Sequence, residues 1–331
     1  MAEAPAGDRT RAEDGASGGA PELSVVLVTD GDDTIRPVVE RLHRQTARDR
    51  LEVLLVAPAG ARAGVGFRDA ARDFARLTVL EVESIAPLAA ARAAGIRAAS
   101  APLVFVGETH TFPHPGWAAA LLAAHRGPWV AVAPGFGNAN PKGALSWAGF
   151  LSDYGRWVAG LPAGEIPEVP LYNASYRRSA LLDLGDRLVP ALSHGDELPI
   201  RLRAAGHRVY FEPTARIDHA NVARPRAWLD ERFASGVLIG SHRARTWSAL
   251  RRVAYVAGAA LIPVVLVARV LPGVRRTARH ARLPAGTLTA IVVGAIVKAA
   301  GELVGYAGGR TESPEMRMHE YEVHKLAYVA R

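Results

Sequence analysis

Four short apolar runs, separated by stretches with helical spacing, constrain the fold of this chain more than any other feature. The runs occupy residues 23–29, 51–56, 78–82 and 103–106 and are rich in valine and leucine. Apolar runs of this length, bounded by loop residues, are typical of strands buried on both faces. Because strands that alternate with helices form right-handed βαβ units, the pattern predicts an α/β fold with a mostly parallel sheet flanked by helices.

Length and composition exclude several classes of protein. The chain has 331 residues, no cysteine and a formal net charge of +8. This length allows one large α/β domain with an appendage, and the lack of cysteine excludes disulfides, thiolate metal sites and cysteine nucleophiles. A basic chain can bind nucleic acid, an anionic membrane or a phosphorylated substrate. Because the sequence has no RNA-binding signature, zinc finger or basic-aromatic stripe, we expect no nucleic-acid partner.

The composition changes along the chain and predicts four segments. Residues 1–22 have no apolar core of the kind found in a signal peptide, and we expect a disordered tail there. Residues 23–248 contain the alternating pattern and form the predicted α/β domain. Residues 249–309 are predicted to form hydrophobic, membrane-associated helices, and residues 310–331 a C-terminal tail.

Two uncharged apolar stretches, 253–268 and 285–297, suggest contact with a membrane. A spanning helix needs about 20 apolar residues, so the first stretch is marginal and the second is short. The segment between them carries five arginines, four of which lie close together: Arg275, Arg276, Arg279 and Arg282. A spanning hairpin would place these cations opposite a cytoplasmic catalytic domain, against the positive-inside tendency. We therefore expect a re-entrant or interfacial helix pair with its arginines on anionic headgroups, the alternatives being helices packed on a soluble domain or a spanning pair.

Short motifs occur in a characteristic order between residues 23 and 245. They include residues 91–96 (ARAAGI), 115–117 (PGW), 173–178 (NASYRR) and 202–206 (LRAAG). This order resembles that of the inverting family 2 glycosyltransferases of GT-A fold. The resemblance implies a Rossmann-like GT-A domain that uses a nucleotide-sugar donor and a divalent metal ion.

The resemblance also places a candidate metal site after the fourth run. In that family the matching strand ends in an Asp-x-Asp motif that holds a divalent ion on the nucleotide diphosphate. The matching residues here are Glu108 and His110, and His219 matches a histidine that some members place near the same metal. Glutamate can bind Mg²⁺ or Mn²⁺, whereas histidine is a better ligand for Mn²⁺ or Zn²⁺ than for Mg²⁺. The alternative is that these residues only hydrogen-bond within loops, and His114 is a competing ligand.

The general base is predicted less directly. Inversion requires a group that takes the proton of the acceptor hydroxyl. The family uses an acidic pair at the start of the helix that ends here near Gly206. Asp196 and Glu197 are the local carboxylates, although their register is displaced by about two residues from the family pattern. The alternative is that both are acids stabilised by the helix dipole.

The donor side of the site is predicted from four further residues. Family members present an aspartate after the second strand, where this chain has Ala57 and Pro58. Asp30 and Asp32 after the first run could contact the nucleoside instead, with turn capping as the alternative. Arg92 could face the nucleotide, and the simpler interpretation is that it is an exposed helix cation. Asn173 lies on the loop that should face the acceptor or donor sugar.

The resemblance therefore implies a membrane-associated enzyme whose catalytic domain is cytoplasmic. It would move a sugar, with inversion, from a nucleotide-sugar to a lipid-linked or envelope glycan acceptor, with Mn²⁺ or Mg²⁺ as cofactor. The missing aspartate and the displaced acidic pair leave two alternatives. One is a catalytically divergent GT-A-like module that binds nucleotide-sugar or glycan without transfer, and the other is a membrane scaffold.

Overall fold

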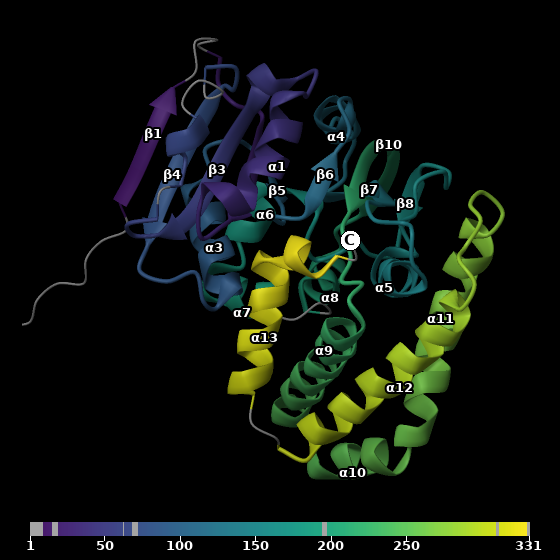
Figure 1. Ribbon diagram of the computed structural model, residues 1–331. Coiled ribbons are helices and arrows are strands. Elements are labelled where there is room, and N and C mark those ends of the chain that lie inside the picture. Colours follow the sequence, from purple (N-terminus) through teal and green to yellow (C-terminus); the bar gives the residue numbers. More distant parts are fainter. Residues whose placement is uncertain are drawn as a thin grey trace, which may run out of the picture. The chain divides into compact units, whose positions relative to one another are not determined.

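The computed structural model describes residues 9–14, 19–61, 63–67, 72–193, 197–308 and 311–329 (Figure 1). The chain divides into two compact units. The first comprises Met1–Gly135 and Ala159–Ile217, and the second comprises Phe136–Val158 and Asp218–Arg331.

The first unit is built on a parallel sheet whose strands are the four apolar runs. In spatial order these strands are β4 (Arg76–Val82), β3 (Leu51–Pro58), β2 (Leu23–Val28) and β5 (Leu103–Val106). Leu23 of β2 pairs with Leu51 on one side and with Leu103 on the other. Every residue of β2 and β5 is buried, as expected for strands covered on both faces. The predicted α/β class is confirmed.

Antiparallel pairings extend this sheet in both directions. Within the described residues the full order is β1-β4-β3-β2-β5-β9-β7-β10-β6, with β8 paired to β10. The added strands are β1 (Arg9–Asp14), β6 (Thr111–Pro113), β7 (Ala131–Asn138), β8 (Gly164–Ile166), β9 (Ala174–Arg177) and β10 (Val209–His219). A Rossmann-like parallel half followed by antiparallel strands is the GT-A arrangement that the resemblance implies. Residues 9–14 lie in the predicted N-terminal tail, but they pair with β4, whose edge would otherwise be open.

Short helices flank the sheet of the first unit. They are α1 (Asp32–His43), α3 (Leu88–Ala98), α4 (Trp117–Ala124), α6 (Arg178–Leu182), α7 (Leu188–Ser193) and α8 (Glu197–Ala204), with 3₁₀ turns at Arg48–Arg50, Val65–Phe67 and Gly185–Arg187. Gly95 allows α3 to lie close to β2, since a Cβ there would be 2.5 Å from Cγ1 of Val26. Close packing of α3 orders the edge at which β2 and β5 end.

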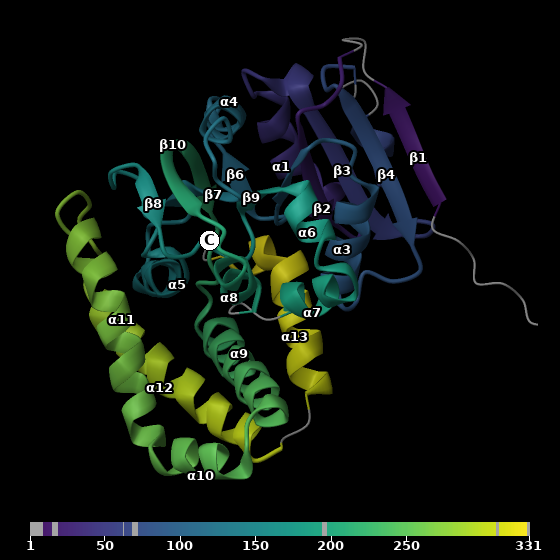
Figure 2. The same ribbon diagram turned by 180° about the vertical axis from the view of Figure 1, so that it is seen from behind.

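The second unit is helical, and α9 and α12 run side by side within it in both views (Figures 1 and 2). Its helices are α5 (Ala144–Tyr154), α9 (Pro225–Thr246), α10 (Ala249–Ala257), α11 (Ile262–Thr277), α12 (Thr287–Tyr306) and α13 (Glu312–Val323), with 3₁₀ turns at Ala259–Leu261 and Lys325–Tyr328. Glycines make the α9–α12 contact possible. A Cβ on Gly236 would lie 2.1 Å from the carbonyl oxygen of Lys298, and one on Gly301 would lie 2.2 Å from that of Phe233.

The predicted C-terminal tail contains α13, which packs against α9. Tyr321 and Arg317 both bind the carboxylate of Asp230 on α9, and Tyr321 is buried. The carbonyl oxygen of Tyr328 also accepts hydrogen bonds from the backbone N–H groups of Ala223 and Arg224. These long-range contacts order a segment that the sequence predicted to be a tail.

Replacing Gly301 with alanine should destabilise the second unit, because its Cβ would collide with the backbone of α9. Overpacking of this kind costs about 1–3 kcal/mol. We expect a lower midpoint of chemical denaturation for Gly301→Ala and no loss for Gly164→Ala, where a Cβ meets nothing within 4 Å. Equal midpoints for the two variants would show that the α9–α12 contact is not as close as described.

Candidate metal centre

Glu108 and His110 lie in the loop that joins β5 to β6, and both are buried. Strand β5 ends at Val106, and the N–H of the next residue, Gly107, donates to the carbonyl oxygen of Val26. A Cβ on Gly107 would lie 2.7 Å from Cδ2 of Leu27, so a residue without a side chain lets the loop leave the sheet here. Nε2 of His110 lies 3.3 Å from Oε2 of Glu108.

Asn173 orients the carboxylate of Glu108. Its Nδ2 donates to Oε2 of Glu108 at 2.5 Å, while its Oδ1 accepts from the hydroxyl of Thr111 at 2.9 Å. Asn173 has a positive φ of 57°, a conformation that asparagine adopts more readily than most residues. The structure therefore places this predicted donor-site or acceptor-site residue behind Glu108, with its side chain buried. Its predicted contact with a ligand stays a prediction.

His219 is the last residue of β10 and is 2% exposed. Its Nδ1 lies 3.0 Å from Oδ1 of Asn221, and its ring contacts that of Tyr154 with 4.5 Å between centroids. Glu108, His110 and His219 each offer one ligand atom, and these atoms lie within 4.8 Å of one another. One carboxylate and two imidazoles could hold a single divalent cation, and this donor set suits Mn²⁺ or Zn²⁺.

The carboxylates of Asp30 and Asp32 both accept hydrogen bonds from residues of the first unit. Asp30 accepts from the hydroxyl of Thr34 at 2.5 Å. The carboxylate of Asp32 accepts from the backbone N–H groups of Gly64 and Gly66 at 2.6 and 2.7 Å. These are contacts within the protein, and a role in nucleoside binding stays a prediction.

Arg92 is buried on α3 rather than exposed on its surface. Its guanidinium carbon lies 3.6 Å from the centroid of the Tyr172 ring, a cation–π geometry. Tyr172 in turn donates from its hydroxyl to the carbonyl oxygen of Leu192. Arg92 is therefore not the exposed helix cation of the simpler interpretation.

The predicted acidic pair is described only in part. Asp196 lies outside the described residues. Glu197 is the first residue of α8, and its Oε1 accepts from Nε and Nη2 of Arg201 at 3.0 and 2.5 Å. An ion pair one turn along the helix engages this carboxylate.

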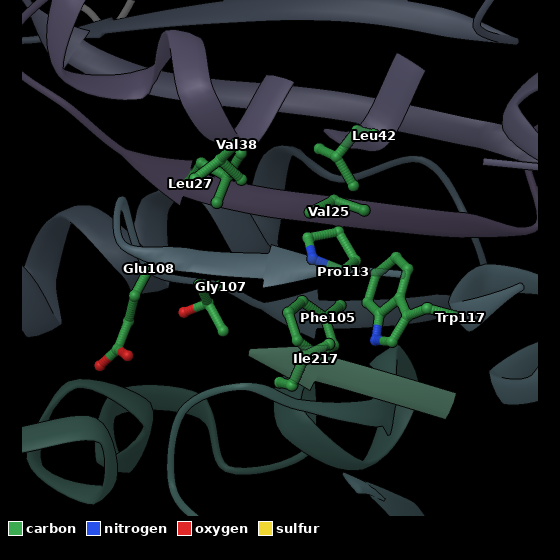
Figure 3. A pocket seen from close by; sticks show the side chains of 11 residues that line it. Val25, Leu27, Val38, Leu42, Phe105, Gly107, Glu108, Pro113, Trp117 and Ile217 are labelled. Carbon is green, nitrogen blue, oxygen red and sulfur yellow. The ribbon is translucent and has the colours of Figure 1, made fainter. Parts of the chain in front are cut away.

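A small pocket lies beside the metal group on the first unit (Figure 3). Apart from Glu108 and Thr111 its lining is apolar: Val25, Leu27, Val38, Leu42, Phe105, Gly107, Pro113, Trp117 and Ile217. Figure 3 shows the carboxylate of Glu108 turned away from these side chains. This pocket therefore belongs to the packing of α1 on the sheet and is not a site for a polar ligand.

Three residues near the site were not predicted from the sequence: Asn221, Tyr154 and Tyr172. The only sequence signal for Asn221 was its position two residues after His219. Tyr154 lies far from His219 in the chain. Tyr172 directly precedes the motif of residues 173–178 but is not part of it.

No family model and no curated protein matches the chain. Its fold is similar to that of the mannosyltransferase PcManGT from Pyrobaculum calidifontis in complex with GDP-Man and Mn²⁺, at 16% identity and a TM-score of 0.45, covering 93% of this chain and 89% of that one. It is also similar to S. aureus TarS 1-349 in complex with UDP, at 14% identity and a TM-score of 0.44, covering 91% of each chain. The match to GalNAc-T7 with UDP, GalNAc and Mn²⁺ has 17% identity and a TM-score of 0.44, and covers 61% of this chain but only 44% of that one. At these identities the likeness concerns the fold alone.

The metal group can be tested directly by Mn²⁺ titration, followed by electron paramagnetic resonance of the free ion. We expect one Mn²⁺ bound per chain, and a loss of affinity of about tenfold or more for His110→Ala and for His219→Ala, because each removes one ligand. His114→Ala is the matched control, since His114 is close in sequence and lies outside the group. Equal Mn²⁺ affinity in all three variants would exclude this centre.

Proposed function

We propose that the chain is a metal-dependent glycosyltransferase that uses a nucleotide-sugar donor. The observation that carries this proposal is the buried group of Glu108, His110 and His219, with two members just beyond the carboxyl end of β5. Ligands of parallel α/β sheets bind at this edge. A divalent ion held there would act as a Lewis acid on a departing diphosphate and neutralise its charge.

Other residues are proposed to orient the carboxylate of Glu108, to take the proton of the acceptor and to line the donor side. Asn173 keeps the carboxylate of Glu108 aimed at the metal through its amide hydrogen bond. Asp196 is the proposed base that takes the proton of the acceptor hydroxyl, with inversion at the anomeric carbon, because Glu197 is engaged by Arg201. Asp30, Asp32 and Arg92 are proposed to line the donor side.

The exposed apolar residues on the helices of the second unit are the basis for proposing a membrane-bound acceptor, either lipid-linked or an envelope glycan. No residue of α10 is buried, and Leu250 and Val253 are 81% and 64% exposed. On α12 the side chains of Leu288, Val292 and Ile296 are exposed at intervals of four residues. Such a row presents one apolar face of a helix to its surroundings.

The packed face of α12 consists mainly of small and apolar residues but includes the buried carboxylate of Glu302, which favours an interfacial helix over a spanning one. Glu302 is buried there and accepts from Nη1 of Arg243 on α9 at 2.9 Å and from the hydroxyl of Tyr306 at 3.0 Å. By length and composition, α12 is the one helix of the described residues that could span a membrane alone, and 44% of its apolar window is buried in the protein. Helix α10 with the segment 259–277 passes the same test only as a pair bent by 60°.

We therefore propose that the exposed faces of α10, α11 and α12 lie in the membrane interface. Arg275, Arg276, Arg279 and Arg282 would contact anionic headgroups, and the catalytic domain would face the cytoplasm. Residues 249–309 thus form the proposed membrane-associated segment, and they would keep the active site near a lipid-linked acceptor.

Catalysis can be tested by incubating the detergent-solubilised chain with a panel of nucleotide-sugars and Mn²⁺ or Mg²⁺, and measuring the release of nucleotide. We expect release with at least one donor, and a loss of about 100-fold or more for Glu108→Ala, because the charge on the leaving group is no longer neutralised. His114→Ala should retain the wild-type rate. Donor binding without release would favour the divergent binding module, and neither binding nor release would exclude both.

Membrane attachment can be tested by flotation of the full chain with lipid vesicles. Each arginine near an anionic surface contributes about 1 kcal/mol, so replacing the four arginines at 275, 276, 279 and 282 with glutamine should weaken binding to anionic vesicles at least tenfold. Neutral vesicles should bind both proteins equally weakly. Extraction of native membranes with alkaline carbonate should release the wild-type chain, and retention would instead show a spanning helix pair.

A further inference from the structure

Three asparagines of the second unit, Asn138, Asn140 and Asn221, are hydrogen-bonded to one another beside His219. The orientation of the Asn138 side chain is fixed by its partners. Oδ1 of Asn138 accepts from the backbone N–H of Asn140 at 3.1 Å and from the hydroxyl of Ser146 at 3.0 Å. A backbone N–H is always a donor, so the atom of Asn138 that faces it must be oxygen.

The orientation of Asn221 follows from that of Asn138. One end of the Asn221 amide lies 3.0 Å from Oδ1 of Asn138 and 3.0 Å from the carbonyl oxygen of His219. Both of these atoms are acceptors, so this end must be the Nδ2 donor. The other end, Oδ1, therefore faces Nδ1 of His219 at 3.0 Å.

The side chain of Asn140 holds the backbone of Asn221 in this position by pairing with both its N–H and its carbonyl group. Its Oδ1 accepts from the N–H of Asn221 at 2.8 Å, and its Nδ2 donates to the carbonyl oxygen of Asn221 at 2.8 Å. Asn221 and His219 are 3% and 2% exposed, so water does not compete for these bonds. The Tyr154 ring, packed against the imidazole, opposes rotation of the His219 ring.

We infer that Asn221 is a positioning residue that keeps the proton of His219 on Nδ1 and so presents Nε2 as the metal ligand. An amide oxygen can only accept, so Nδ1 must donate to it. A histidine ligand binds metal through one nitrogen while a hydrogen bond made by the other nitrogen sets the tautomer. The choice of Nε2 as ligand rests on the proposed metal site, whereas the proton on Nδ1 follows from the asparagines alone.

The tautomer can be measured without metal or substrate, from two-bond proton–nitrogen correlation spectra of the full chain labelled with ¹⁵N-histidine. The resonances of His219 are assigned by their loss in His219→Gln. We expect a protonated Nδ1 in the metal-free wild-type chain, and a shift of Nε2 alone when Zn²⁺ is added. An unprotonated Nδ1 in the wild-type chain would overturn the inference. A protonated Nδ1 with no Zn²⁺ response would uphold the tautomer and instead contradict the metal site.

A pair of variants separates this role from loop stabilisation. Asn221→Leu removes the acceptor for Nδ1–H at similar volume, and we expect a mixed tautomer and a 10- to 100-fold weaker Mn²⁺ affinity, the range seen for partners of ligating histidines. Asn140→Ala weakens the same loop but makes no bond to the imidazole, and it should keep the Nδ1–H tautomer. If both variants lower the melting temperature and leave the tautomer unchanged, Asn221 is only a structural residue. The wild-type spectrum tests the inference even if Asn221→Leu does not fold.

Discussion

The buried carboxylate of Glu108 is the constraint on which the candidate site depends. An ionised carboxylate loses several kcal/mol of hydration when it is buried, and hydrogen bonds or opposite charge must compensate. In the first unit the amide of Asn173 and the imidazole of His110 supply polar partners. Asn173 can do so because it adopts a positive φ directly before β9, with its N–H bound to the carbonyl oxygen of Val106 at the end of β5. The sheet, the loop and the carboxylate are therefore ordered together.

The second unit meets a different requirement with related chemistry. Its helices α9 and α12 lie too close for side chains at the glycine positions, and Arg243, Glu302 and Tyr306 satisfy one another where charges are buried. A helix that is apolar all round would be expected in a membrane core, whereas the packed face of α12 includes the buried carboxylate of Glu302 and its other face exposes Leu288, Val292 and Ile296. These two features are the basis of the proposed interfacial position of α12.

Much of the fold was predictable from the sequence because it depends on local patterns. Strands β2, β3, β4 and β5 are mostly apolar, as is typical of strands in a parallel sheet that is covered on both faces. The proximity of Glu108 and His110 was likewise implied by their spacing. The direction of the Asn173 amide, the pairing of β1 with β4 and the contacts of α13 depend on residues far apart in the chain, which periodicity cannot show. The segment 310–331 was predicted to be a tail because the sequence does not show that residues of α13 bind Asp230 of α9.

The change from a second carboxylate to histidine alters the charge of the proposed centre. Two carboxylates would cancel the charge of a divalent ion. One carboxylate with two neutral imidazoles leaves a net charge of about +1, which would attract the diphosphate. This advantage exists only if both imidazoles are neutral when the metal is bound, since a protonated ring repels the ion and offers no lone pair at that nitrogen. A fixed acceptor beside Nδ1 of His219 directs the proton to the nitrogen that does not bind metal. The amide of Asn221 therefore contributes to the proposed centre through His219.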